Sequence, residues 1–209
     1  MARQGLREQK KQATRRMISN IASGLFIQRG FDNVTVAEVA EAAGVSKMTV
    51  FNYFPRKEDL FLDRHADRLQ ELEQIIRERP SEEPVLATLR RYHHELLATG
   101  HPLSGAIDGA RGFWLIVKSS PALVARTLEQ DRETRDMLAR VLAEEIPDRT
   151  DAELAATVIA AATGSVFEHA INRILDGADG DEVRRDQVAV IDRAFDLIEG
   201  GLGEIPGVS

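Results

Sequence analysis

Residues 35–54, TVAEVAEAAGVSKMTVFNYF, constrain the fold more than any other stretch of this 209-residue chain. Thr35 is a good helix N-cap, and Glu38 three residues later completes a capping-box pattern before an apolar run. Gly44 ends this helix, because glycine adopts the left-handed turn without a Cβ penalty. Ser46 can cap a second helix. The pattern predicts a helix-turn-helix, whose second helix enters the DNA major groove.

The same pattern also fits an ordinary corner between two helices of any helical protein. In the helix-turn-helix interpretation, Val45, Val50 and Phe54 face inward. The outward residues and those at the helix starts are then the candidate DNA-binding residues. They are Thr35, Ser46, Lys47, Met48, Thr49, Asn52, Tyr53 and Lys57, the last because a helix N-terminus offers free N–H groups to a phosphate.

Several short signatures around this stretch favour the DNA-binding interpretation. They are Leu25-Phe26 and Gly30-Phe31, Ala43-Gly44-Val45-Ser46, and Phe54 followed by Lys57-Glu58. With them, residues 14–62 resemble the DNA-binding domain of the tetracycline-repressor (TetR) family of bacterial transcriptional regulators. Many members of that family have tyrosine at the position of Phe51, with its hydroxyl on the DNA backbone. Phe51 cannot donate, so Tyr53 is the better candidate for a phosphate contact.

The net charge of −7 is divided unevenly along the chain. Residues 1–64 hold 11 lysines and arginines against 7 aspartates and glutamates, whereas the remainder holds 16 against 27. Residues 1–30 alone carry seven basic groups and a single glutamate. The sequence therefore predicts that nucleic acid meets the N-terminal part, while the acidic remainder stays away from phosphate.

Composition and the absence of known motifs argue against several other classes of function. An apolar share of 43% suffices for a packed core, and zero cysteines exclude disulfides and thiolate sites. The five histidines lack metal-binding spacing, and no nucleophile elbow or phosphate-binding glycine loop occurs. We therefore expect no metal, no cofactor, no catalytic residue and no enzyme. No apolar run is judged long enough for a membrane and no signal peptide is recognised, so we expect a cytoplasmic protein.

Proline, glycine and acidic breaks divide the chain into helical stretches. Residues 2–12 are expected to form a disordered basic arm, with a helix that begins at about Arg7 and ends at Gly30. Further helices are predicted over about 57–79, 85–99, 103–118, 119–145, 151–175 and 182–199. The predicted fold is all-α, with a three-helix DNA-binding domain over residues 1–56. A helical ligand-binding and dimerisation domain follows over residues 57–209.

Phe113-Trp114 is the one distinctive feature of the C-terminal part. Adjacent aromatics on a helix cannot share one face, so one can line a groove; two core aromatics are an equal alternative. The resemblance implies a small-molecule pocket in this domain, for a lipophilic or acyl-type ligand. The candidate ligand-binding residues are His94, Arg111, Phe113 and Trp114.

The last two predicted helices suit a contact between subunits. Small side chains on the 151–175 helix allow close helix packing, and an apolar stripe follows on the last helix. The resemblance implies a homodimer joined by these two helices from each subunit. The candidate interface residues are Val158, Ile159, Ala162, Val166, Ile191 and Phe195.

These features predict a homodimeric DNA-binding regulator, a repressor released from a near-palindromic DNA operator by a ligand. Two alternatives stay open. A ligand-independent DNA-binding protein of the same fold would have a closed interior without a pocket. A non-DNA helical adaptor would bind no DNA at all.

Overall fold

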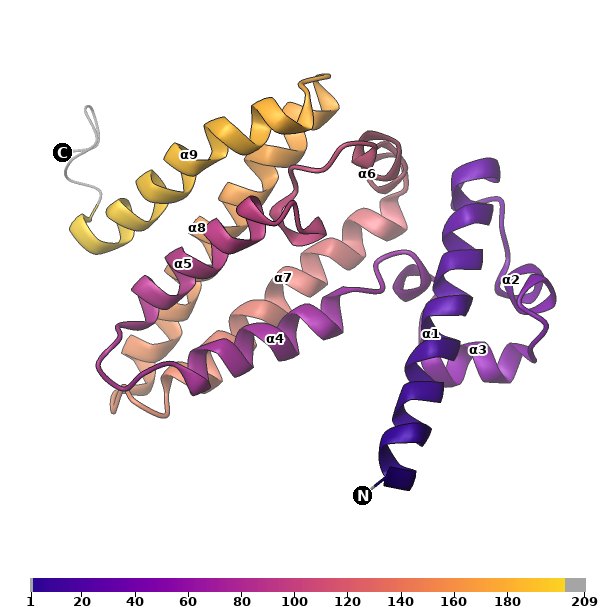
Figure 1. Cartoon of the computed structure of the whole chain (residues 1–209), viewed down its shortest axis with the longest axis horizontal. Coiled ribbons are helices and arrows are strands. Elements are labelled where there is room, and N and C mark those ends of the chain that lie inside the picture. Colours follow the sequence, from indigo (N-terminus) through magenta and orange to yellow (C-terminus); the bar gives the residue numbers. More distant parts are fainter. Residues whose placement is uncertain (1, 202–209) are drawn as a thin grey trace. The chain divides into compact units, whose positions relative to one another are not determined.

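The computed structural model of this protein is an arrangement of helices joined by short turns (Figure 1). It describes residues 2–201, with the side chains of residues 9–201. All regular elements in this range are helical, which confirms the all-α prediction. The elements are α1 (Ala2–Arg29), α2 (Val36–Ala42), α3 (Lys47–Tyr53), η1 (Glu58–Leu60), α4 (His65–Glu78), α5 (Val85–Ala98), η2 (Pro102–Ser104), α6 (Ala110–Ser119), α7 (Pro121–Leu142), α8 (Arg149–Leu175) and α9 (Gly180–Gly200).

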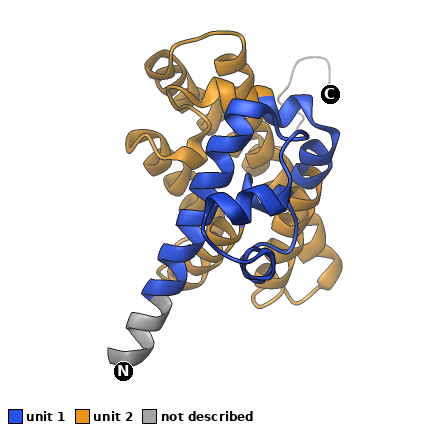
Figure 2. Ribbon diagram, turned by 90° about the vertical axis from the view of Figure 1, so that its right-hand side faces the viewer, with its two compact units in different colours: residues 1–65, 116–127 blue, residues 66–115, 128–209 orange. Residues whose placement is uncertain are grey.

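The chain forms two compact units, which Figure 2 shows in different colours. We call residues 1–65 with 116–127 the head, and residues 66–115 with 128–209 the body. Helices α6 and α7 therefore begin in one unit and end in the other. The head takes in more of the chain than residues 1–56, for which a DNA-binding domain is predicted.

The head is built around aromatic side chains. Helix α1 buries Ile18, Ala22 and Phe26, which recur every fourth residue and so share one face. The ring of Phe26 lies 4.9 Å from that of Phe31 and 5.6 Å, edge-on, from that of Phe61. Phe26, Phe31 and Phe61 thus form one aromatic cluster in the core of the head.

Two polar contacts hold the corner between α6 and α7 within the head. Ser120 donates its hydroxyl to Asp32 at 3.2 Å. Arg126 pairs with Asp59 at 2.8 Å, with only 12% and 18% of their side chains exposed. An ion pair so far removed from water is stronger than an exposed one, so it ties the first turns of α7 to η1.

In the body, α5 packs on α9 and α9 packs on α8. Their shared core includes Leu89, Ile159 and Phe195, which are each at most 5% exposed. Arg90 of α5 reaches Asp196 of α9 at 2.7 Å, and Arg173 of α8 reaches Glu182 at 2.6 Å. These pairs at the rim align the helices, while burial of apolar surface supplies most of the stability.

Three predicted stretches differ from the structure. Residues 2–12, expected as a disordered arm, belong to α1. The predicted helix over 57–79 is broken after η1, because Leu60 and Phe61 are both buried in the head core and the chain turns before α4. The predicted helix over 103–118 begins only at α6, because Gly105 and Gly109 have φ angles of 76° and 79°, outside the helical region.

Helix α8 also corrects the expectation about membrane spans. By length and composition it is apolar enough to cross a membrane, and it is one such helix among the described residues. Seven of its residues are buried in the body, among them Ala152, Ile159 and Ile174. The core helix of a water-soluble protein passes the same test.

Candidate functional site

The predicted capping box positions the helix-turn-helix. Thr35 accepts a hydrogen bond on its hydroxyl from the backbone N–H of Glu38, and its own N–H donates to the Glu38 carboxylate at 2.8 Å. Gly44 then turns the chain with a φ angle of 64°. Ser46 caps α3 by accepting from the backbone N–H of Thr49 at 3.0 Å. The capping box, the glycine turn and the second cap are all confirmed.

Helix α3 separates a buried side from an exposed side. Val50 is fully buried, and Phe54 at its C-cap is 1% exposed. Lys47, Met48 and Asn52 are exposed, with Met48 at 69%. The structure thus places these three predicted DNA-binding residues together on one outward surface of the head.

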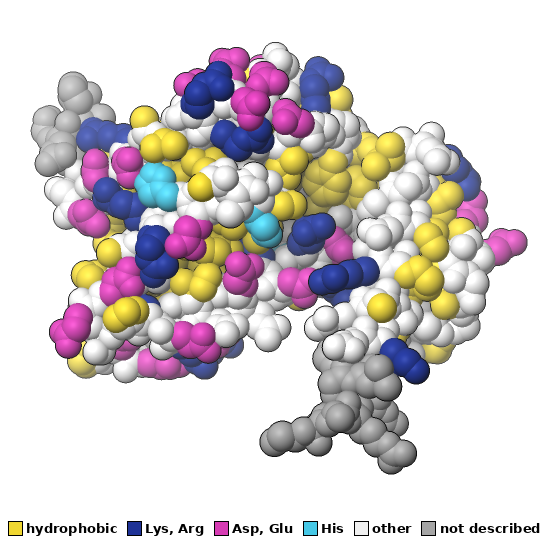
Figure 3. All heavy atoms as spheres, in the orientation of Figure 1, with side chains coloured by type: hydrophobic (Ala, Val, Ile, Leu, Met, Phe, Trp, Pro, Cys, Tyr) yellow, Lys and Arg dark blue, Asp and Glu magenta, His cyan; other side chains and the backbone are white. Residues whose placement is uncertain are grey.

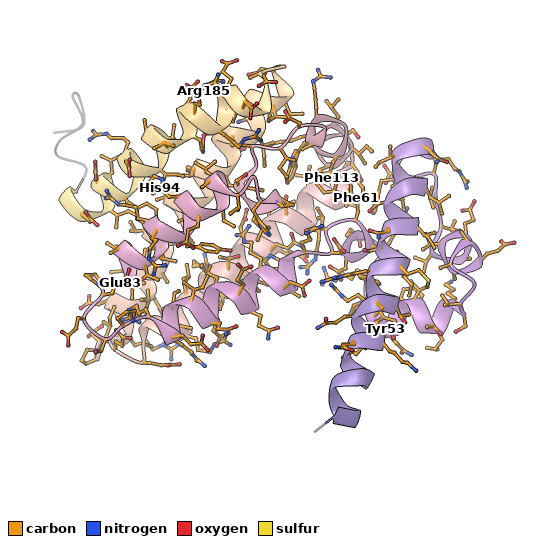
Figure 4. All side chains as sticks on the ribbon, viewed as in Figure 1. Tyr53, Phe61, Glu83, His94, Phe113 and Arg185 are labelled. Atoms are coloured by element: carbon orange, nitrogen blue, oxygen red, sulfur yellow. The ribbon has the colours of Figure 1, made fainter. Side chains whose placement is uncertain are left out.

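The other predicted DNA-binding residues of α3 are less exposed. Thr49 is half-buried and shares a hydrogen bond with Ser46. Tyr53 is half-buried at the last turn of the helix, where Figure 4 labels it. Phe51 is 38% exposed, and the Lys47 ammonium lies 5.8 Å from its ring centre. The aromatic ring therefore orients a candidate base-reading side chain.

Lys57 has a structural role that the sequence did not indicate. Its ammonium donates to the backbone carbonyl of Phe31 at 2.6 Å. It also lies 4.2 Å from the centre of the Phe31 ring. Burial lowers the pKa of Lys57. The predicted contact of Lys57 with phosphate stays a prediction, because it competes with these internal contacts for one ammonium.

Glu38 links the capping box to the first helix. The hydrogen bond from the backbone of Thr35 lowers the pKa of Glu38 from 4.5 to about 2, with further contributions from Arg29 and the Thr35 hydroxyl. The Arg29 guanidinium pairs with the Glu38 carboxylate at 2.7 Å. One carboxylate thus fixes both the start of α2 and its position on α1.

The body contains a cavity of about 40 Å³. Most of its wall is apolar, with Leu72 of α4, Leu89 of α5 and Leu138 of α7 among the lining residues. The polar lining residues are Arg68, Tyr92, His93, Ser104, Thr134, Thr163 and Gln187. They come from segments more than 100 residues apart in the chain, which explains why no local motif pointed to them. The sequence does indicate an inward position for Arg68, because it lies four residues before Leu72 and so on the apolar side of α4.

The predicted ligand residues do not line this cavity. His94 pairs with Asp192 at 2.8 Å between α5 and α9, and Figure 4 shows it well apart from Phe113 of α6. Arg111 donates to the backbone carbonyl of Leu175 at 3.1 Å. The Trp114 ring is 5.0 Å from that of Phe113. Trp114 reaches the cavity only indirectly, through Phe167, a lining residue whose ring is 5.6 Å away.

The predicted interface residues fall on two sides of α8 and α9. Ile159, Val166, Ile191 and Phe195 are at most 5% exposed and belong to the core of the subunit itself. Ala162 is half-buried. The sequence pattern could not separate the inner face of this alanine-rich helix from its outer face. The apolar residues left exposed are Leu154 and Val158 on α8 and Val188 on α9, at 59%, 50% and 44%.

The body surface carries charge of both signs. In Figure 3, acidic and basic side chains lie side by side over the face of the body that it shows. Arg91, for example, pairs with Glu83 at 3.2 Å and with Glu95 at 3.3 Å. On this face of the described body, basic side chains are interspersed with acidic ones and form no broad basic patch.

A capped helix-turn-helix with polar side chains projecting from its second helix, followed by a helical body, defines a class of DNA-binding regulators. Two family models match the chain: bacterial regulatory proteins of the tetR family over residues 18–63, and the MftR C-terminal domain over residues 84–203. The chain belongs to the TetR family of bacterial transcriptional regulators.

Curated relatives agree with this assignment. The chain is 28% identical over 144 residues to the transcriptional regulator TcmR of Streptomyces glaucescens, a match that covers 66% of this chain and 63% of TcmR. It is 30% identical over 91 residues to the fatty acid metabolism regulator protein of Bacillus subtilis, covering 42% of this chain and 47% of that protein. The chain therefore matches between about half and two thirds of the length of these relatives.

Solved structures share the fold. NalD of Pseudomonas aeruginosa, the secondary repressor of a multidrug efflux pump, has a TM-score of 0.54 at 15% identity over 88% of this chain and 97% of its own. FadR of Bacillus subtilis, solved with stearoyl-CoA, has a TM-score of 0.51 at 23% identity over 89% and 98%. Both similarities extend through head and body.

Proposed function

We propose that this protein is a transcriptional repressor that binds a near-palindromic operator as a homodimer and leaves it when a small ligand enters the body. The observation that carries the proposal is the outward surface of α3, where Lys47, Met48 and Asn52 project from a helix that two caps hold in place. Lysine and asparagine are side chains that hydrogen-bond to base edges in the major groove. Relatives that are regulators support regulation rather than catalysis, and contact with chromosomal DNA implies a cytoplasmic protein.

Two heads are required because a single short recognition helix reads few base pairs. The exposed apolar residues of α8 and α9 supply a surface that pairing of two subunits would bury. Leu154 and Val158 lie four residues apart on one face of α8, and the small residues Ala161 and Ser165 continue that face. Small side chains there allow two copies of α8 to approach closely.

Release of DNA follows from linkage between ligand and conformation. A ligand that binds one conformer more tightly shifts the population toward it, by no more than the difference in affinity. A 100-fold loss of DNA affinity corresponds to about 2.7 kcal/mol of coupling. Helices α4 and α7 can transmit a change at the cavity to the head, since both line the cavity and both include residues of the head.

The relatives support a ligand of apolar character. FadR of Bacillus subtilis was solved with stearoyl-CoA, and another structure of the same fold is a SmeT–triclosan complex. The cavity in this body is mostly apolar as well. These similarities favour a lipophilic or acyl-type ligand over a purely polar one.

The test is selection of genomic DNA fragments from the source organism by the purified protein, followed by sequencing. We expect enrichment of one near-palindromic sequence with wild-type protein and weaker enrichment of it with Asn52→Ala, at unchanged thermal stability. Undiminished enrichment with Asn52→Ala would place recognition elsewhere on the head. Absence of any enriched sequence would favour the helical adaptor instead.

A further inference from the structure

Arg68 of α4 is a partly buried cation on which the negative charge of Asp131 acts without forming an ion pair. It lies four and eight residues before the core residues Leu72 and Ile76, so it points to the inner side of α4. Its guanidinium lies over the Phe167 ring, 6.0 Å from the centroid, and makes no hydrogen bond or ion pair with any described residue. Burial lowers the pKa of Arg68, against smaller opposing effects of Tyr92 and Asp131. A cation in such a place gains from an anion that enters.

Tyr92 of α5 supplies a second unmet polar group in the same cavity. The residue is 5% exposed, and its buried hydroxyl has no hydrogen-bond partner among the described residues. Burial raises the pKa of Tyr92 to about 12, so the hydroxyl keeps its proton at neutral pH and can donate. Buried polar groups without a partner are rare, and each one calls for an explanation.

His93 is not a second cation in this cavity. Its Nδ1 donates to the backbone carbonyl of Leu89 at 2.8 Å, and burial lowers the pKa of His93 to about 4. The ring is therefore neutral at pH 7, and it adds no second positive charge to the cavity. Arg68 is the one cation that lines this cavity in the described part of the chain.

From these groups we infer that the cavity binds a lipophilic acid, whose carboxylate is held by Arg68 and the Tyr92 hydroxyl while its hydrocarbon part lies among Leu72, Leu89 and Leu138. The inference rests on the proposed function and names the chemical class of the ligand. A guanidinium presents several N–H donors in a plane and can bind both oxygens of a carboxylate. The hydroxyl adds a third donor, and the leucines accept the apolar part.

The volume of the cavity adds a condition on binding. About 40 Å³ holds a few water molecules and is far smaller than a typical ligand site of several hundred Å³. An acid with a hydrocarbon chain must therefore widen the cavity when it binds. The wider conformer is the one that the ligand prefers, which is the differential affinity that release of DNA requires.

The experiment is isothermal titration of the DNA-free protein with octanoate and with octanamide, which has the same chain and a neutral head. We expect saturable binding of octanoate, with octanamide at least about ten-fold weaker. Arg68→Gln should weaken octanoate about 10- to 100-fold and leave octanamide unchanged. Tyr92→Phe, which removes only the hydroxyl, should weaken octanoate by about ten-fold.

One control variant and several possible results test the inference further. Arg149→Gln removes an exposed arginine from the same body and should change neither ligand. Equal binding of acid and amide, no binding of octanoate, or full octanoate affinity in both Arg68→Gln and Tyr92→Phe would overturn the inference. Binding of octanoyl-CoA alone would also overturn it, because the carboxylate is then absent. None of these results depends on DNA, so the proposed function is tested separately by the selection of operator fragments.

Discussion

The head and the body are both made of helices, but they leave different groups unsatisfied. In the head, the aromatic core around Phe26 is closed, and the candidate functional side chains Lys47 and Asn52 are exposed on α3. In the body, the unmet groups are internal, at Arg68 and the Tyr92 hydroxyl, and an apolar strip that includes Val158 is left outside. The head therefore presents its candidate functional groups on its surface, whereas the body keeps Arg68 and the Tyr92 hydroxyl at an internal cavity.

The largest expected effect is on the stability of the body, and it distinguishes a charge on the inner face of α8 from one on its outer face. Ile159→Asp puts a charge in the core of the body and should lower the free energy of unfolding by about 3–5 kcal/mol, measured by urea denaturation. Val158→Asp puts the same charge on the exposed side. It should leave the folded subunit intact and give monomers in sedimentation. A Val158→Asp protein that stays dimeric would place the interface elsewhere.

The next effect tests the exposed surface of the head. Lys47→Ala and Asn52→Ala should each cost about 1–3 kcal/mol of binding to the selected operator, because each removes a candidate base contact. Fluorescence anisotropy with labelled operator measures it. The loss should be smaller on unrelated DNA, where no base pair is specified.

A matched control for these variants lies on the neighbouring helix. Glu41→Gln changes an exposed side chain of α2 and should retain the sequence preference of the wild type. Equal losses of Lys47→Ala and Asn52→Ala on operator and unrelated DNA would mean that α3 contacts only phosphates.

Lys57 offers a smaller effect that distinguishes two roles. If its ammonium stays on the Phe31 carbonyl, Lys57→Ala should lower the free energy of unfolding by about 1–2 kcal/mol, as expected when a buried hydrogen bond is lost. The salt dependence of DNA binding should then be unchanged. A salt slope that falls by about 0.9 would instead support the phosphate contact predicted from the sequence.

The smallest expected effect is the pH dependence of the capping box. The pKa of Glu38 is about 2 in the folded head and 4.5 without these contacts. Its ionised form therefore stabilises the head above about pH 4.5, and this contribution is lost as the pH falls toward 2. Glu38→Gln should lower the melting temperature at pH 7 more than at pH 3. A difference that is the same at both pH values would contradict this role.

The sequence predicted the head well because its signals are local. Thr35, Gly44 and Ser46 each act within four residues of themselves, so their caps and turns could be predicted from spacing alone. The aromatic Phe61 was placed on a continuous helix because only the tertiary core shows that the chain turns there. Local propensity gives no information on such a turn.

The body was harder to predict because its site depends on long-range contacts. Phe113 and Trp114 stand out in the sequence, yet the cavity is lined by Arg68, Tyr92 and their neighbours from distant helices. An alanine-rich helix such as α8 has no strong apolar stripe, so the buried Ile159 and the exposed Val158 could not be told apart.

Operator geometry tests the central claim, binding of DNA by two paired heads, most directly. The measurement compares the affinity of the wild-type protein for the selected near-palindromic operator and for a copy with about five base pairs inserted at its centre, which turns one half-site by about half a helical turn. We predict a loss of roughly 100-fold or more, because only one head can then bind. Equal affinity for the two DNA fragments would contradict the account.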